Sequence, residues 1–91
     1  MRLLENKTAL ITGGSRGIGE GIALKFAEQG ASIAFTYLSS DEKARALEAK
    51  LESLGVKAKG YKSDAGIYAA AEQLANDVVK EFGTIDICVN N

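Results

Sequence analysis

Residues 12–19 read Thr-Gly-Gly-Ser-Arg-Gly-Ile-Gly, and this stretch decides how the chain is organised. The apolar run KTALIT at residues 7–12 leads into it, and apolar residues at helical spacing follow it. Glycines allow a tight turn and let another molecule approach the backbone closely. At the start of a helix the backbone N–H groups are unpaired and carry partial positive charge. The stretch therefore predicts a phosphate-binding turn between a strand and a helix.

The spacing of the glycines narrows the kind of phosphate site. They fall as Gly13-x-x-x-Gly17-x-Gly19, with Ser15 in place of a glycine in the more common G-x-G-x-x-G pattern. No Lys-Ser or Lys-Thr pair follows, which disfavours a nucleoside-triphosphate loop and leaves a dinucleotide pyrophosphate as the expected ligand. The alternative is a tight turn without a ligand. It is disfavoured because several glycines within eight residues weaken a turn unless something must approach it.

The rest of the chain alternates between two apolar periods. Short apolar runs predict strands, and stripes repeating every three to four residues predict helices that end at Gly30, Gly55 and Gly83. Ser39 and Glu42 have the spacing of a capping box for the second helix. The expected strands are residues 7–12, 31–37, 56–62 and 85–89. The expected helical stripes are Ile18, Ile22 and Phe26 beside Ala23 and Ala27; Ala44, Leu47, Leu51 and Leu54; and Ala71, Leu74, Ala75, Val78 and Phe82.

This alternation predicts a Rossmann-type α/β fold. Strands separated by helices of 10 to 17 residues imply right-handed crossovers and a doubly wound parallel sheet. The expected strand order is 3-2-1-4, with the mixed-composition strand at residues 56–62 on one edge. Ligands bind at the carboxyl ends of strands where the order reverses. The reversal between the first and fourth strands places residues 12–19 at that crevice.

Composition limits the function classes. The chain has 91 residues, 46% of them apolar and 25% charged, and a net charge of −1. This suits one domain or part of one, and gives no electrostatic reason to expect nucleic acid or a membrane as a partner. There is no histidine, so neither a histidine metal site nor a Ser-His-Asp triad is expected. The first residues lack the apolar core of a signal peptide, and a cytoplasmic location is expected. The single cysteine, Cys88, is expected to be a buried and inert thiol, with a reactive thiol as the alternative.

Three features together resemble the short-chain dehydrogenase/reductase family. They are the Thr12–Gly19 turn, Asp64 after the third strand, and the stretch Asp86-Ile87-Cys88-Val89-Asn90-Asn91, which resembles the start of that family's Asn-Asn-Ala-Gly motif. They span the whole chain in the family's order. Within the family, TGGSRGIG and its separation from the Asn-Asn pair are most similar to bacterial 3-oxoacyl-[acyl-carrier-protein] reductases.

The resemblance implies roles for individual residues. The pyrophosphate and adenosine ribose would be lined by Gly13, Ser15, Arg16, Gly17, Ile18 and Gly19. Asp64 would accept from the adenine amino group beside the Ala65 backbone, although its spacing suits a helix N-cap equally well. Asn91, and less directly Asn90, would meet the cofactor ribose or brace the sheet, and the alternative for both is a strand-end turn.

The end of the second strand indicates which nicotinamide cofactor is preferred. An NAD site uses an acid there to bond the ribose 2′-OH, but position 37 is Tyr37 and no acid follows the strand before Asp41. Arg16 is a cation for a 2′-phosphate, and Ser39 and Ser40 are possible donors to its oxygens. NADP(H) is therefore expected over NAD(H). The alternative for Arg16 is a solvated surface charge.

The family's catalytic groups, a serine, a Tyr-x-x-x-Lys pair and an asparagine, lie beyond the Asn-Asn-Ala-Gly motif. No tyrosine of this chain has lysine four positions later, so no catalytic residue is expected within it. The chain is expected to be the N-terminal part of one dinucleotide-binding domain. Three functions stay open: an NADPH-dependent 3-oxoacyl-thioester reductase of fatty acid synthesis, another short-chain reductase or sugar or alcohol dehydrogenase, and a non-catalytic nucleotide-binding module. The resemblance implies a small or carrier-bound substrate and a homo-oligomer, a tetramer in the family.

Overall fold

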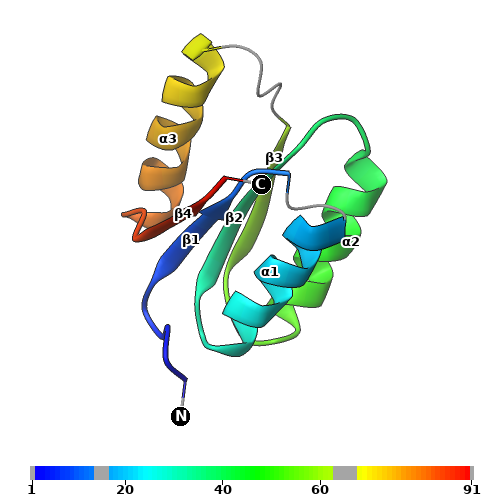
Figure 1. The fold of residues 1–91 in the computed structure, drawn as a ribbon, viewed down its shortest axis with the longest axis vertical. Helices are drawn as coiled ribbons and strands as arrows, with labels where there is room; N and C mark the ends of the chain where they lie inside the picture. Colours follow the sequence, from blue (N-terminus) through cyan, green and yellow to red (C-terminus); the bar gives the residue numbers. More distant parts are fainter. Residues whose placement is uncertain (1, 14–16, 63–67, 91) are drawn as a thin grey trace.

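The computed structural model of the chain describes residues 2–13, 17–62 and 68–90. Strands and helices alternate along it, as the apolar periods predict (Figure 1). The elements are β1 Thr8–Ile11, α1 Gly17–Glu28, β2 Ser32–Tyr37, α2 Asp41–Glu52, β3 Ala58–Lys62, α3 Tyr68–Phe82 and β4 Ile87–Val89.

The four strands form one parallel sheet in the order β3-β2-β1-β4. In register, Leu10 of β1 lies between Ala34 of β2 and Cys88 of β4. The predicted fold and strand order are confirmed. Because β1 lies in the middle, the turn that follows it is bordered by the ends of β2 and β4.

Helices α1 and α2 cover one face of the sheet, and α3 lies on the other (Figure 1). On the α1/α2 face, Ile11, Ile33 and Phe35 are fully buried. Helix α1 meets them through its smallest residues, spaced four apart: Gly19, Ala23 and Ala27. Small side chains let the helix approach the sheet closely.

This packing corrects the predicted stripe of α1. Ile18 was expected on the buried face, but its side chain is 75% exposed. Ile22 and Phe26 are partly buried at the margin of the core. The small residues occupy the contact line, so the larger ones are turned to its flank. Ile18 is thereby left at the start of the helix, beside the glycine-rich turn.

The α3 face is less well covered, and this corrects the prediction for Cys88. Its buried residues are Leu10, Ala34 and Val78, from β1, β2 and α3. Cys88 pairs with Leu10 in the sheet, yet its side chain is exposed. β4 is a three-residue strand at the edge of the sheet and contributes no buried residue to this face. An apolar sequence context therefore did not make this thiol a buried one.

The helix ends also test the predicted caps. Gly30, Gly55 and Gly83 each have a positive φ just after a helix, as expected of C-terminal stops. The N-cap of α2 is Ser40, whose Oγ accepts a hydrogen bond from Lys43 N–H at 3.3 Å. The predicted capping box of Ser39 with Glu42 is therefore wrong by one residue. Ser39 is exposed, and its hydroxyl does not serve as the cap.

Candidate functional site

The carboxyl ends of β1, β2 and β4 meet at one edge of the sheet (Figure 1). Thr12 and Gly13 continue from β1, residues 38–40 continue from β2, and Asn90 follows β4. This is the edge at which parallel α/β sheets bind ligands, on either side of the strand where the order reverses.

A side chain of β2 holds the first glycine of the turn. Thr36 is only 5% exposed. Its hydroxyl accepts a hydrogen bond of 2.9 Å from Gly13 N–H. Thr36 lies within an apolar strand, of which Ile33, Ala34, Phe35 and Tyr37 belong to the core. Its polarity was the signal in the sequence, and sequence reasoning did not assign it to the site.

The other side of the turn is joined to β4. Thr12 N–H donates to the Val89 carbonyl at 3.0 Å, and the Thr12 hydroxyl donates to Asn90 Oδ1 at 3.1 Å. Asn90 thus links the end of β4 to the start of the turn, and its contact with a cofactor ribose stays a prediction. Together with Thr36, these contacts fix the start of the turn from both neighbouring strands.

The backbone of the turn requires glycine at two described positions. Gly13 has φ 66° and Gly17 has φ 59°, a left-handed conformation that costs other residues free energy. A Cβ added to Gly17 would meet no described heavy atom within 4 Å. Glycine is therefore used there for its conformation and for the open space beside it, and not to relieve a contact within the protein. Such a backbone at the start of a helix fits a pyrophosphate.

The predicted site residues divide into two groups. Those in the described chain are Gly13, Gly17, Ile18, Gly19, Tyr37, Ser39, Ser40 and Asn90, all on β1, β2, β4, the adjoining turns or the start of α1. Ser15, Arg16, Asp64, Ala65 and Asn91 lie outside the described residues. Contact of any of them with a cofactor stays a prediction.

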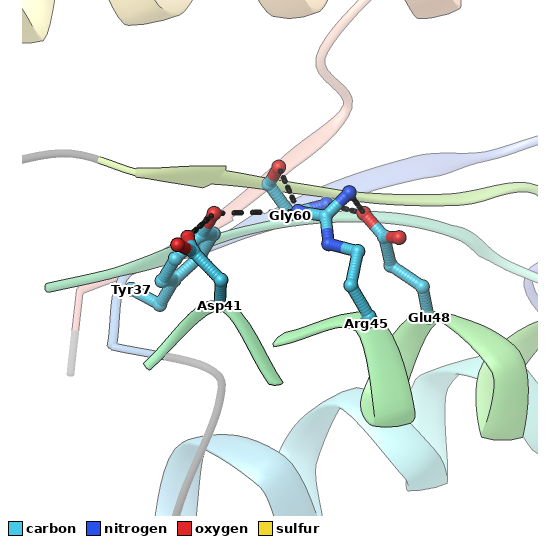
Figure 2. Close-up of polar contacts among 5 residues, drawn as sticks. All are labelled: Tyr37, Asp41, Arg45, Glu48 and Gly60. Atoms are coloured by element: carbon cyan, nitrogen blue, oxygen red, sulfur yellow. Dashed lines mark hydrogen bonds and ion pairs between the residues drawn. The ribbon is translucent and has the colours of Figure 1, made fainter. Parts of the chain in front are cut away.

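Tyr37 is the last residue of β2, and it is buried and hydrogen-bonded to two residues of α2 (Figure 2). Its hydroxyl donates to Asp41 Oδ1 at 2.8 Å, and Arg45 Nη2 donates to the same hydroxyl oxygen at 3.4 Å. The hydrogen bond to Asp41, followed by burial, raises the pKa of Tyr37 above its ordinary value. The hydroxyl is therefore a protonated donor at neutral pH. Sequence reasoning placed Tyr37 correctly at the strand end but did not predict these partners.

Two charged residues of α2 form hydrogen bonds with backbone groups of Gly60 in the edge strand β3 (Figure 2). Glu48 Oε2 accepts from Gly60 N–H at 2.6 Å, and Arg45 Nη2 donates to the Gly60 carbonyl at 3.3 Å. Arg45 and Glu48 also pair with each other at 2.9 Å. An edge strand with its backbone groups occupied is a poor template for another strand. This set occupies both backbone groups of Gly60, in the middle of the edge strand on the side away from β4.

The described residues hold neither a metal-binding cluster nor a membrane-spanning helix. No group of three or more Cys, Asp or Glu side chains is placed to hold a metal ion in residues 2–13, 17–62 and 68–90. None of the helices in that part of the chain has the length and apolar character needed to cross a membrane.

Comparison with known proteins gives one family. The short chain dehydrogenase family matches residues 7–91. Over 86 residues the chain is 38% identical to a 3-oxoacyl-[acyl-carrier-protein] reductase of Staphylococcus epidermidis, a match covering 94% of this chain and 35% of that protein. It is 40% identical over 91 residues to an L-rhamnose 1-dehydrogenase (NAD(P)(+)) of a Sphingomonas strain, covering 100% and 36%. It is 41% identical over 88 residues to a hydroxynaphthalene reductase of Aspergillus fumigatus, covering 97% and 32%.

Solved structures agree with this assignment of the fold. A short chain dehydrogenase from Burkholderia cenocepacia in complex with NADP is 44% identical, with a TM-score of 0.95, covering all of this chain and 37% of its own. A blue fluorescent protein from a metagenomic library in complex with NADPH is 40% identical, with a TM-score of 0.93, covering 97% and 36%. The chain thus spans about a third of the length of the relatives it matches.

Proposed function

The chain belongs to the short-chain dehydrogenase family, and from that premise we propose that it supplies the coenzyme-binding part of an NADP(H)-dependent reductase. The observation that carries the proposal is the Thr12–Gly19 turn. Gly13 and Gly17 in it are left-handed, and its start is held by Thr36 of β2 and by β4. The turn would present backbone N–H groups to the pyrophosphate. Exposed Ile18 would offer an apolar surface beside it.

The preference for a 2′-phosphate rests on the last residue of β2, on the residues that follow it, and on Arg16. Tyr37 takes the place where an NAD site uses an acid, and its hydroxyl is already bonded to Asp41. Ser39 and Ser40 follow, and Arg16 in the turn would supply the cation. Two similar structures, the Burkholderia cenocepacia dehydrogenase and the metagenomic blue fluorescent protein, are complexes with NADP and NADPH, which supports this preference.

The reaction proposed for the whole protein is reduction of a 3-oxoacyl thioester to its 3-hydroxyacyl form, with the coenzyme supplying the hydride. Residues 2–13, 17–62 and 68–90 would bind and orient the coenzyme. The serine and the Tyr-x-x-x-Lys pair would come from the part of the protein that follows. That part would also cover the open edge of β4 and exposed Cys88. A homo-oligomer and a carrier-bound substrate belong to the same proposal.

A second candidate is a sugar or alcohol dehydrogenase on the same fold. It is favoured by the match to L-rhamnose 1-dehydrogenase, which has an identity similar to that of the thioester reductase. The two candidates share the coenzyme site and differ in the substrate, because a fold by itself does not determine substrate.

Assays of the complete polypeptide encoded by the gene would separate these candidates. Consumption of NADPH with acetoacetyl thioesters is compared with reduction of NADP⁺ by L-rhamnose or glucose. Turnover of the thioester alone supports the proposed reaction, and turnover of a sugar alone supports the second candidate. If the protein binds NADPH and turns over neither class, it is a different reductase of the family or a binding module. Failure to bind any nicotinamide nucleotide would contradict the proposal itself.

A further inference from the structure

Asp41 is the first acidic residue after β2, and its position bears on which coenzyme the site accepts. Asp41 is the first residue of α2 and follows the Leu38-Ser39-Ser40 connection. In NAD-selective sites a carboxylate near this place bonds the ribose 2′-OH, and the same charge repels a 2′-phosphate. Asp41 is therefore near enough in the chain to oppose the proposed NADP(H) preference, unless its carboxylate is held elsewhere.

The structure shows such a restraint on both carboxylate oxygens. Oδ1 accepts the 2.8 Å hydrogen bond from the Tyr37 hydroxyl, and Oδ2 lies 3.9 Å from Lys62 Nζ of β3. Tyr37 is 6% exposed, and its ring packs in the core with its centroid 6.5 Å from the centroid of the Phe35 ring. A hydroxyl on a ring fixed in this way holds its partner in one place. Figure 2 shows Asp41 and Tyr37 turned toward each other at the start of α2.

The two restraints differ in strength. The side chains of Lys62 and Asp41 are 58% and 66% exposed, so water and salt screen their attraction. The Tyr37 bond is short, is made to an anion, and comes from a buried donor, and hydrogen bonds to charged acceptors are stronger than neutral ones. Tyr37 should therefore dominate, with Lys62 as a smaller contribution.

We infer that Tyr37 is a specificity-determining residue, which holds the Asp41 carboxylate against α2 and β3 and so leaves the end of β2 acceptable to a 2′-phosphate. This inference rests on the proposed function, because it concerns the adenosine end of the same coenzyme site. It assigns Tyr37 a positioning role through Asp41, and no role in the chemistry.

The test measures equilibrium dissociation constants for NADPH and NADH, by titration calorimetry, on the complete polypeptide. In Tyr37→Phe the carboxylate loses its buried donor and is free to oppose a 2′-phosphate or to bond a ribose 2′-OH. The expected result is a five- to tenfold rise in the NADPH constant, with the NADH constant unchanged or lower. Adding Asp41→Asn to Tyr37→Phe removes the charge and should restore NADPH binding to within twofold. Tyr61→Phe is the matched control, because the Tyr61 hydroxyl is buried without a partner among the described residues.

Each outcome has one reading. Equal weakening of NADPH and NADH by Tyr37→Phe, or no rescue by Asp41→Asn, would overturn the inference and leave Tyr37 a purely structural residue. If Tyr37→Phe does not fold, Lys62→Ala decides, with a selective loss of about twofold for NADPH supporting the inference and no selective loss overturning it. If the native protein binds neither nucleotide, the proposed function fails. If it binds both but prefers NADH, the NADP(H) preference fails and the inference with it.

Discussion

Thr36 of β2 holds Gly13 of the glycine-rich turn through a 2.9 Å hydrogen bond from the glycine N–H to the threonine hydroxyl. The two residues are 23 positions apart: Thr36 lies in β2, and Gly13 lies in the turn that follows the neighbouring parallel strand β1. The bond fixes the point where the chain leaves β1. In this way a side chain of β2 fixes the start of the turn that follows β1.

Replacing Thr36 with valine tests this relationship. Valine has nearly the same shape but cannot accept the hydrogen bond, so the start of the turn should be less well held. NADPH affinity of the complete polypeptide should fall about five- to tenfold, since a net hydrogen bond contributes about 0.5–1.5 kcal/mol. Thr36→Ser keeps the hydroxyl and should stay within about twofold of the native affinity. Equal NADPH affinities for the valine and serine variants would show that the Thr36 hydroxyl does not contribute to coenzyme binding.

Glycine 60 of β3 is required by a close approach and not by its φ. A Cβ built there would lie 2.6 Å from Phe35 Cζ, and Phe35 is fully buried, so its ring would have to shift within the packed core. Gly60→Ala should therefore destabilise the fold by about 1–3 kcal/mol through overpacking. The matched control is Gly21→Ala in α1, where a Cβ meets nothing within 4 Å. That variant should gain about 0.5–1 kcal/mol of helix stability.

Urea unfolding of the complete polypeptide, followed by circular dichroism, measures both glycine variants. Opposite shifts of the unfolding midpoint are expected. Shifts of the same sign would show that the ring of Phe35 does not limit the space at Gly60.

Asp86 ties the start of β4 to the start of β1. Its carboxylate accepts from Thr8 N–H at 2.9 Å, and its own N–H donates to the Thr8 carbonyl at 2.9 Å. Asp86→Ala removes the acceptor from a backbone group of a buried residue and should cost about 1–3 kcal/mol in the free energy of unfolding. Asp86→Asn retains a carbonyl oxygen and should cost less. An alanine variant as stable as the native protein would contradict this account of how β4 is placed.

Two tyrosines should ionise late. The hydrogen bond to Asp41 and then burial raise the pKa of Tyr37, while burial and then the charges of Glu81 and Asp77 raise the pKa of Tyr61. Above pH 10 the folded state then binds more protons than the unfolded state, so stability should fall as the pH rises from there. Absorbance near 295 nm during an alkaline titration measures this. Tyr37→Phe and Tyr61→Phe should each remove a late-ionising component, and removal of an early one would contradict the structure.

The sequence predicts the fold well, because apolar periodicity reports which face of an element is buried. It identifies all four strands, the three helix-ending glycines and the order β3-β2-β1-β4. It misplaces side chains where packing depends on neighbours elsewhere in the chain. Ile18 is exposed because α1 meets the sheet through its small residues, and Cys88 is exposed because β4 lies at an edge.

The candidate site is predicted in outline only. Motif spacing locates Gly13 and Gly17, since a left-handed turn leaves a direct mark on the sequence. Long-range polar partners leave a weaker mark: the polarity of Thr36 within an apolar strand singles out the residue but not its partner. The bonds from Gly13 to Thr36 and from Tyr37 to Asp41 depend on strand register and on the rotation of α2, which periodicity does not specify.

The proposed function requires that the Thr12–Gly19 turn binds NADP(H) and that Arg16 recognises the 2′-phosphate. The most direct test is titration of NADPH and NADH into the complete native polypeptide and into Arg16→Ala, with Arg16→Lys to retain the charge. The native protein should bind NADPH more tightly than NADH. Arg16→Ala should weaken NADPH binding at least tenfold and change NADH binding less than twofold, with Arg16→Lys between, as expected for a charge-assisted contact of roughly 1.5–3 kcal/mol. Equal losses for both nucleotides, or no loss for either, would contradict the proposed function.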